Sequence, residues 1–343
     1  MNQTDSLVRK NIRELTPYSS ARDEYPGKKG IFLDANESPF GKLNRYPDPY
    51  HRKLRTAISN LYDIPVENIF LGNGSDEAID LMFRIFCDPG RDKALTFTPT
   101  YGMYQVSASA NDVEMIKIPL GETFAINLPD VLKRLKERRI KLIFICSPNN
   151  PTSNCFEREK ILTIIENFRG IVVIDEDYID FSNQESFISL TGKYENLVVL
   201  RTFSKAWGAA AIRVGMVFGC SDIIKYLYRV KPPYNISALN QKAALKRIGK
   251  AEKFRKQVEM ILEERNKLAE KIRSLEITEK VFPSDSNFLL VKVNNADAVY
   301  NFLTGKNIII RNRNSVIPNC LRITVGTKEE NKRLLKELNK IRI

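Results

Sequence analysis

The stretch 201–210, followed by Arg213, brings a hydroxyl, an amine and a guanidinium close together in the chain. It comes directly after the apolar run 197–200, so these polar side chains follow the end of an expected buried strand. A lysine amine such as that of Lys205 becomes a nucleophile when it is desolvated or lies near other cations, and it then forms an imine with an aldehyde. Ser204 and Arg213 both suit a phosphate group. The pattern fits a site for a phosphorylated aldehyde cofactor, although a basic surface loop after a strand has the same composition.

Acidic side chains follow a second apolar run, 171–174. Asp175 comes first, and Glu176, Asp177 and Tyr178 follow it. A carboxylate at a strand end can pair with a pyridinium nitrogen and keep it protonated, so that the ring accepts electrons from a carbanion. The Tyr178 hydroxyl suits the phenolate oxygen of such a ring. Asp175 is favoured because it lies closest to the strand, while Glu176, Asp177 and a plain turn-capping acid stay open as alternatives.

Other strand ends carry further polar side chains. The Asn150 amide suits a ring hydroxyl. The segment 71–77 runs from a strand into a helix, where free N–H groups bind phosphate, and Glu77 replaces the third glycine of a dinucleotide fingerprint. Tyr101 suits the face of a heterocycle, and Arg322 lies in a strand-like run where a charge needs an anionic partner. Each of these residues also has an interpretation without a ligand: Asn150 in a plain Asn-Pro turn, Tyr101 as a core tyrosine, and Arg322 paired with an internal Asp or Glu.

These residues need a scaffold, and the hydrophobic pattern predicts one. From about residue 45 to 235, short apolar runs alternate with helical patterns, which is typical of a parallel sheet with crossover helices. The expected strands are 69–71, 94–97, 142–145, 171–174, 197–200 and 214–218. In such sheets ligands bind at the carboxyl ends of the strands, where the polar residues above lie.

The pattern changes after Pro232 and Pro233. A long charged helix is expected within 250–280, followed by strands at 288–293 and 321–325 and a last helix that begins at a capping box formed by Thr327 and Glu330. We therefore predict an N-terminal arm with part of the small domain over 1–44, a large domain over 45–235 and a small α+β domain over 236–343.

Composition limits the partners. The 343 residues contain 54 Lys and Arg against 41 Asp and Glu, which gives a net charge of +13. Much of the positive charge is interleaved with glutamates on the 250–280 helix and no nucleic-acid motif is found, so a nucleic-acid-binding protein is an unfavoured alternative. We expect anionic small molecules as partners.

Cysteine and histidine usage exclude other classes. The five cysteines form an odd set without a CxxC pair, which indicates reduced thiols in a cytoplasmic protein. No apolar run approaches the roughly 18 residues that a membrane helix needs, and the N-terminus is polar. His51 is the single histidine, which argues against a triad hydrolase and a multi-histidine metal site, and we expect no metal.

Taken in order, these residues resemble those of the fold-type I aminotransferases, which use pyridoxal phosphate. The order is Asn150, Asp175, Tyr178, Ser204, Lys205, Arg213 and Arg322. Within that family, segments similar to those of histidinol-phosphate aminotransferases are 15–22, 33–37, 45–47, 99–104 and 320–327. The resemblance covers nearly the whole chain.

The resemblance implies an α/β protein with the fold of type I pyridoxal-phosphate-dependent transferases: a large domain with a mostly parallel sheet between helices, and a smaller α+β domain. It implies a homodimer with each active site at the subunit interface. The implied reaction, in histidine biosynthesis, is transamination between L-histidinol phosphate and 2-oxoglutarate, giving imidazole acetol phosphate and L-glutamate.

The resemblance also implies residue roles. Lys205 would be the imine lysine and proton carrier, Asp175 the partner of the ring nitrogen, and Tyr101 the ring that stacks on the cofactor. Asn150 and Tyr178 would bind the ring oxygen. The cofactor phosphate would be surrounded by Ser75, Asp76, Ser204, Arg213 and, from the neighbouring subunit, Tyr46. The substrate anion would be bound by Arg322, with Arg311, Tyr18 and Asn36 completing the substrate set.

Three departures from the family pattern carry expectations. Ser153 replaces a glycine, and we expect Asn154 to take over the left-handed turn. Ala211 replaces another glycine and should crowd its turn slightly, and the link between Arg311 and Arg322 is shorter than in the family. A threonine-phosphate decarboxylase on the same scaffold is the enzymatic alternative, which would need no amino acceptor.

Overall fold

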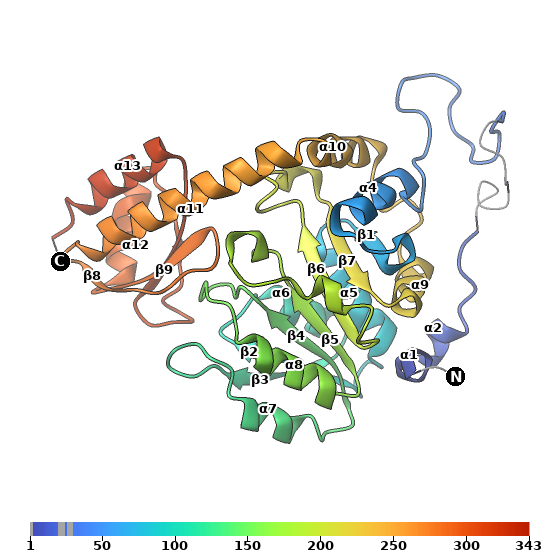
Figure 1. The fold of residues 1–343 in the computed structure, drawn as a ribbon, viewed down its shortest axis with the longest axis horizontal. Coiled ribbons are helices and arrows are strands. Elements are labelled where there is room, and N and C mark those ends of the chain that lie inside the picture. Colours follow the sequence, from blue (N-terminus) through green and yellow to red (C-terminus); the bar gives the residue numbers. More distant parts are fainter. Residues whose placement is uncertain (1–2, 20–24, 26–29, 343) are drawn as a thin grey trace.

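The structure is a computed structural model that describes residues 3–19, 25 and 30–342. The described residues form a seven-stranded sheet with the order β1-β7-β6-β5-β4-β2-β3 (Figure 1). Its strands are β1 (Ile69–Gly72), β2 (Lys93–Thr98), β3 (Glu114–Pro119), β4 (Ile140–Cys146), β5 (Ile171–Asp175), β6 (Leu197–Thr202) and β7 (Gly215–Gly219). The six apolar runs predicted as strands are confirmed.

Two features of this sheet differ from the sequence prediction. Strand β7 runs antiparallel to both of its neighbours, β1 and β6, whereas the other pairs are parallel. Strand β3 was not predicted, because it is a half-exposed edge strand in which charged residues interrupt the apolar pattern. The antiparallel direction of β7 brings its first residue to the edge where the parallel strands end.

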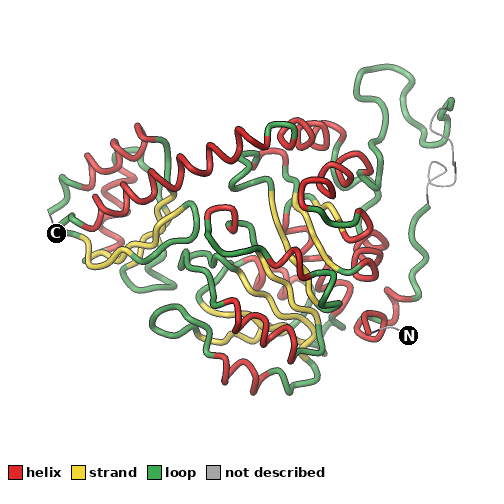
Figure 2. The backbone as a smooth tube through the Cα atoms, viewed as in Figure 1, coloured by secondary structure: helices red, strands yellow, loops and turns green. Residues whose placement is uncertain are grey.

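Helices cover both faces of the large sheet, and Figure 2 shows the strands as a layer between them. One face is covered by helices that share a hydrophobic core with the strands: α5 (Ser75–Phe86), α6 (Met103–Ala110) and α9 (Ser221–Val230). The other face is covered by α4 (Arg52–Tyr62), α7 (Leu128–Arg134), α8 (Arg158–Asn167) and α10 (Ala238–Ile248). This two-sided burial explains why the central strands read as continuous apolar runs.

A second, smaller unit holds a four-stranded antiparallel sheet with the order β10-β11-β9-β8. Its strands are β8 (Thr278–Val281), β9 (Phe288–Val293), β10 (Arg311–Asn312) and β11 (Cys320–Thr324). Its helices are α12 (Ala296–Gly305) and α13 (Lys328–Leu338), and α13 begins with the predicted capping box of Thr327 and Glu330. The long helix α11 (Ala251–Arg273) runs from the large sheet to the small one (Figure 1), and it lies within the range 250–280 in which the sequence predicted a helix.

The N-terminal residues lie beside the large sheet. Helices α1 (Gln3–Leu7) and α2 (Lys10–Arg13) contact α9, and Val8 and Ile12 join the core on that side. Residues 30–50, which precede α4, loop out at the edge of the molecule (Figure 1). Residues 20–22 of the family-like segment 15–22 lie outside the described residues. The domain boundaries at 44 and 235 stay predictions. Among the helices of the described residues, none has the length and apolar content needed to cross a bilayer.

Candidate active site

Asp175, the last residue of β5, lies buried at the carboxyl edge of the large sheet, with 3% of its surface exposed. The Tyr104 hydroxyl donates to Asp175 Oδ2 at 2.7 Å, and the Asp177 backbone N–H donates to Asp175 Oδ1 at 3.2 Å. Burial raises the pKa of Asp175, although the hydrogen bond from Tyr104 opposes the rise. The carboxylate is therefore held in a fixed orientation, and burial makes its charge unfavourable.

Asp177 lies on the same side of the strand end. Its Oδ2 accepts a hydrogen bond from the Ser75 hydroxyl at 3.2 Å. Its Oδ1 is buried without a hydrogen-bond partner among the residues that the structure describes. Burial and the neighbouring Asp175 raise the pKa of Asp177 well above its usual range, while the Lys205 amine lowers the pKa of both acids. A cationic or hydrogen-bond-donating ligand would relieve this buried pair.

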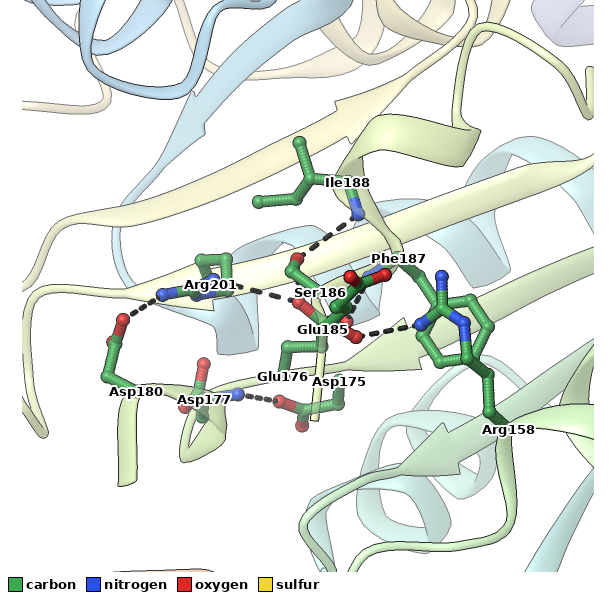
Figure 3. A network of polar contacts seen from close by, with 10 residues as sticks. All are labelled: Arg158, Asp175, Glu176, Asp177, Asp180, Glu185, Ser186, Phe187, Ile188 and Arg201. Carbon is green, nitrogen blue, oxygen red and sulfur yellow. Dashed lines mark hydrogen bonds and ion pairs between the residues drawn. The ribbon is translucent and has the colours of Figure 1, made fainter. Parts of the chain in front are cut away.

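Glu176 faces the opposite way, as Figure 3 shows. Its carboxylate accepts from the Phe187 N–H at 2.6 Å and from the Ser186 hydroxyl, and it lies 3.7 Å from the Arg201 guanidinium. Arg201 also pairs with Asp180. The two acids that the sequence left open as alternatives to Asp175 therefore differ in surroundings. Glu176 is paired within the fold, and Asp177 shares the site of Asp175.

Lys205 lies in the loop that follows β6. The Thr202 side chain organises this loop by accepting from the Ser204 N–H at 3.1 Å, and the Gly208 N–H donates to the Lys205 carbonyl at 3.0 Å. The Lys205 amine lies 5.5 Å from the centroid of the Tyr178 ring. It thus shares one site with Tyr178 and the two acids of the neighbouring strand end.

Four side chains form what we call the anion pocket: Ser75, Asp76, Ser204 and Arg213. The Arg213 guanidinium donates to Ser204 Oγ at 3.3 Å and to Asp76 Oδ2 at 3.2 Å. Ser75 and Asp76 open helix α5, whose first N–H groups have no partner within the helix and so favour an anion. Gly74 makes the close approach feasible, because its φ is +81° and a Cβ there would lie 2.5 Å from Arg213 Nη2.

The turns at the two replaced glycines differ from expectation. Ser153 itself takes the left-handed conformation, with a φ of +67°, so the prediction that Asn154 takes over the turn is wrong. The Ser153 hydroxyl donates to the Pro283 carbonyl of the small unit at 3.0 Å, which helps to hold this conformation. Ala211 lies exposed in a short 3₁₀ helix, Ala210–Ile212, so the expected crowding is absent there.

A third set of side chains joins the two units. The Asn150 amide nitrogen lies 3.5 Å from the Tyr178 hydroxyl, and its oxygen accepts from the Arg322 guanidinium. The Phe288 ring contacts both Tyr178 and Arg322: its centroid lies 5.2 Å from the centroid of the Tyr178 ring and 5.3 Å from the Arg322 guanidinium. Burial raises the pKa of Tyr178 well above its usual range and lowers the pKa of Arg322. Arg311 lies directly opposite Arg322 on the paired strand, so the small sheet brings both predicted substrate arginines together.

Tyr101 lies next to the anion pocket, where its hydroxyl donates to Asp76 Oδ1 at 3.0 Å. Its ring meets the Tyr104 ring edge-on, with centroids 5.6 Å apart and an interplanar angle of 87°. The sequence reasoning missed Tyr104, the fully buried partner of Asp175. Its place one turn after Tyr101 at the start of a helix was the available signal, but a core tyrosine has the same pattern.

The three predicted residues that lie before α4, Tyr18, Asn36 and Tyr46, have other contacts within this chain. Tyr46 stacks on Tyr234 with centroids 4.4 Å apart, and together with Asn36 these residues line a cavity of about 770 Å³. Tyr18 lines a different cavity, beside Tyr50 and Tyr228. A single chain thus brings the strand-end residues together near Lys205, while Tyr18, Asn36 and Tyr46 line other cavities.

The comparisons with known proteins agree with this geometry. The sequence profile of the family described as aminotransferase class I and II matches residues 24–338. This chain belongs to the class I and II aminotransferases. The aminotransferase is 48% identical over 338 residues to the histidinol-phosphate aminotransferase of Cytophaga hutchinsonii, and the match covers 96% of this chain and 97% of the relative.

Solved structures share the fold of this aminotransferase. The histidinol-phosphate aminotransferase of Clostridium acetobutylicum superposes with a TM-score of 0.80 at 24% identity, covering 87% of this chain and 90% of that one. The Sinorhizobium meliloti histidinol-phosphate aminotransferase, solved in complex with pyridoxal-5'-phosphate, superposes with a TM-score of 0.79 at 19% identity, covering 89% of each chain. At these identities the superpositions establish the pyridoxal-phosphate-dependent fold predicted from the sequence.

Proposed function

We propose that this aminotransferase transfers an amino group between L-histidinol phosphate and 2-oxoglutarate in histidine biosynthesis, with pyridoxal phosphate as cofactor. The observation that carries the proposal is the placement of the Lys205 amine near the buried Asp175 and Asp177 and 5.5 Å from the centroid of the Tyr178 ring. The nearly half-identical relative named for this reaction supports the choice of substrate.

The residues present fit the cofactor. The anion pocket would hold its phosphate, and the first N–H groups of α5 would add donors. Asp175 would accept from the protonated ring nitrogen, which matches a buried carboxylate that lacks a cation of its own apart from Lys205. Asn150 and Tyr178 would donate to the ring oxygen, and Tyr101 would lie against the ring. When bound, the cofactor supplies an aldehyde that takes up the amino group and a ring that accepts electrons.

Lys205 would perform two tasks. Its amine would hold the cofactor, and it would move a proton from the substrate Cα. The buried Tyr104 keeps Asp175 pointed toward the ring position through its 2.7 Å hydrogen bond. Arg322 orients the substrate by its phosphate or carboxylate, and the hydrogen bond to Asn150 places that guanidinium on the cofactor side.

We also propose that the protein works as a homodimer in the cytoplasm. Large apolar side chains of the arm are exposed, with 88% of Leu33, 83% of Phe40 and 69% of Leu43 accessible. A second copy that covers them would bring Tyr46, Asn36 and Tyr18 toward its partner's site. The five cysteines are free, which supports a reducing compartment. Sedimentation of the purified protein tests the dimer.

Absorption spectroscopy of the purified protein, saturated with pyridoxal phosphate, tests the reaction. Histidinol phosphate should change the visible band of the bound cofactor, and 2-oxoglutarate should restore it. Lys205→Ala should retain cofactor without a covalent link and lower turnover by about 10⁴-fold or more, whereas the exposed Lys253→Ala should behave as wild type.

Two outcomes would contradict the proposal. A spectral change with phenylalanine or threonine phosphate but not with histidinol phosphate would refute the substrate, and near-normal turnover by Lys205→Ala would refute the role of that lysine. Loss of CO₂ without any need for 2-oxoglutarate would instead identify a decarboxylase.

A further inference from the structure

Three arginines share one face of the small sheet. Arg311 on β10 lies directly opposite Arg322 on β11, and residues opposite each other point to the same face. The backbone N–H of Arg313 donates to the backbone carbonyl of Cys320 at 2.9 Å. This hydrogen bond extends the pairing of β10 and β11 to Arg313, two residues after Arg311. Since side chains alternate along a strand, Arg313 projects on the same side as Arg311 and Arg322. It was absent from the residues that the family pattern suggested.

The intervening side chains confirm this alternation. Asn312 and Asn314 both donate to the carboxylate of Asp297 on α12, at 2.6 and 2.8 Å. That carboxylate is therefore engaged on the opposite face, where the helices of the small unit pack. The arginine face instead holds Phe288, which contacts Tyr178 and Arg322 of the active site.

The three guanidiniums have no counter-charge in the part of the chain that the structure describes. Within residues 3–19, 25 and 30–342, none of them forms an ion pair with a carboxylate. The Arg313 side chain is half-buried, and its Nε is shielded from solvent without a hydrogen-bond partner among these residues. Burial, then Arg322 and Arg311, lower the pKa of Arg313. Clustered cations of this kind repel one another until an anion binds between them.

We propose that Arg313 is a third guanidinium of the substrate-anion site and that it makes the enzyme favour a phosphate over a carboxylate. This inference rests on the proposed function and concerns how the two substrates are told apart. A phosphate monoester carries close to two negative charges and three acceptor oxygens, whereas a carboxylate carries one charge and two oxygens. One bidentate guanidinium suffices for a carboxylate, and the additional donors of Arg313 match the larger, more highly charged group.

Steady-state kinetics of both half-reactions test the inference. Arg313→Gln should raise KM for histidinol phosphate about tenfold or more and KM for glutamate less than about threefold, with kcat within about threefold of wild type. Arg313→Lys, which keeps the charge but not the fork, should recover part of the loss. Arg273→Gln, an exposed residue at the end of α11, is the matched control and should leave both KM values unchanged.

Titration of the cofactor-saturated protein with inorganic phosphate separates this inference from the proposed function. With the anion pocket filled by cofactor, phosphate reports the arginine site, and Arg313→Gln should bind it about tenfold more weakly than wild type. Equal phosphate affinity of the two proteins, or an equal rise of KM for both substrates, would overturn the role of Arg313. A wild-type protein that binds phosphate in this way but does not use histidinol phosphate would refute the proposed function alone.

Discussion

Asp175 and Glu176 are adjacent acids at the end of β5, and their surroundings differ. Glu176 accepts two hydrogen bonds and lies 3.7 Å from the buried Arg201, so each part of its carboxylate has a partner within the fold. Asp175 shares its side of the strand with a second acid, Asp177, whose Oδ1 has no partner among the described residues. Two consecutive residues therefore belong to different networks: the Glu176 carboxylate has all of its polar partners within the fold, and the pair of Asp175 and Asp177 does not.

The contrast identifies which polar cluster stabilises the fold and which one binds. A buried charge with complete pairing has little to gain from a ligand, whereas a buried carboxylate pair with one nearby amine gains from any cation or donor that enters. Local backbone geometry produces the contrast. Glu176 follows the last residue of β5 and points away from Asp175, and the turn after it brings Asp177 back beside Asp175, where the Asp177 backbone N–H donates to Asp175 Oδ1.

Of the changes that distinguish Asp175 from Glu176, we expect Asp175→Asn to have the largest effect, and to act on catalysis. The amide cannot stabilise a protonated ring nitrogen, so kcat/KM should fall by about 10³-fold, or about 4 kcal/mol. Because the pKa of Asp175 is raised in the folded protein, the ionised carboxylate costs stability at neutral pH. The cofactor-free variant should therefore unfold in urea at the same or a higher concentration than wild type.

Glu176→Gln is the matched control, since it makes the same acid-to-amide change one residue along. Its kcat/KM should stay within about fivefold of wild type. Equal losses of activity in both variants would show that the two faces of the strand end are not functionally distinct.

Glu176→Ala should produce the opposite profile. It leaves the Phe187 N–H and the Ser186 hydroxyl without their acceptor and removes one partner of the buried Arg201. The free energy of unfolding should fall by about 3 kcal/mol, and by less than about 1.5 kcal/mol in Glu176→Gln, which keeps the shape and one oxygen that still accepts from the Phe187 N–H. Urea unfolding of the cofactor-free proteins measures both values, and an unchanged stability of Glu176→Ala would contradict the structural role.

Much of the fold was readable from the sequence because the buried strands are continuous apolar runs bounded by polar ends, and because Thr327 and Glu330 mark a helix start. The direction of a strand could not be predicted, because the apolar pattern of a buried strand is the same whether the strand runs parallel or antiparallel to its neighbours. The antiparallel β7 is the example. In the half-exposed edge strand β3, charged residues interrupt the apolar pattern, so the sequence did not mark it as a strand.

The site was predictable as far as residue type and order go. The resemblance pointed to Arg311 and Arg322, but only the register of β10 and β11 shows that Arg313 joins them. The left-handed turn fell on Ser153 instead of Asn154, and there the Ser153 carbonyl accepts from the backbone N–H of Asp285, a residue of the small unit that is distant in sequence, at 2.7 Å. Contacts between distant segments are the part that local patterns cannot supply.

His51 is a buried titratable group that lies outside both networks at the end of β5. It is 1% exposed and precedes α4 in a left-handed conformation, with a φ of 51°. Burial, reinforced by the nearby Lys231, lowers its pKa to about 3. Between pH 6.5 and 3 the unfolded chain therefore binds a proton at this residue that the folded protein does not, so stability must fall as the pH falls through that window.

The expected loss from His51 between pH 7 and pH 5 is about 2 kcal/mol, at about 1.4 kcal/mol per pH unit below the unfolded pKa. His51→Asn removes the titrating group and keeps a residue type that accepts the left-handed conformation. Urea unfolding of both cofactor-free proteins at the two pH values isolates the difference, since the other titrating groups are common to both. If both proteins lose the same stability, the buried imidazole does not stay neutral, and burial alone does not set the charge of an isolated polar group in this fold.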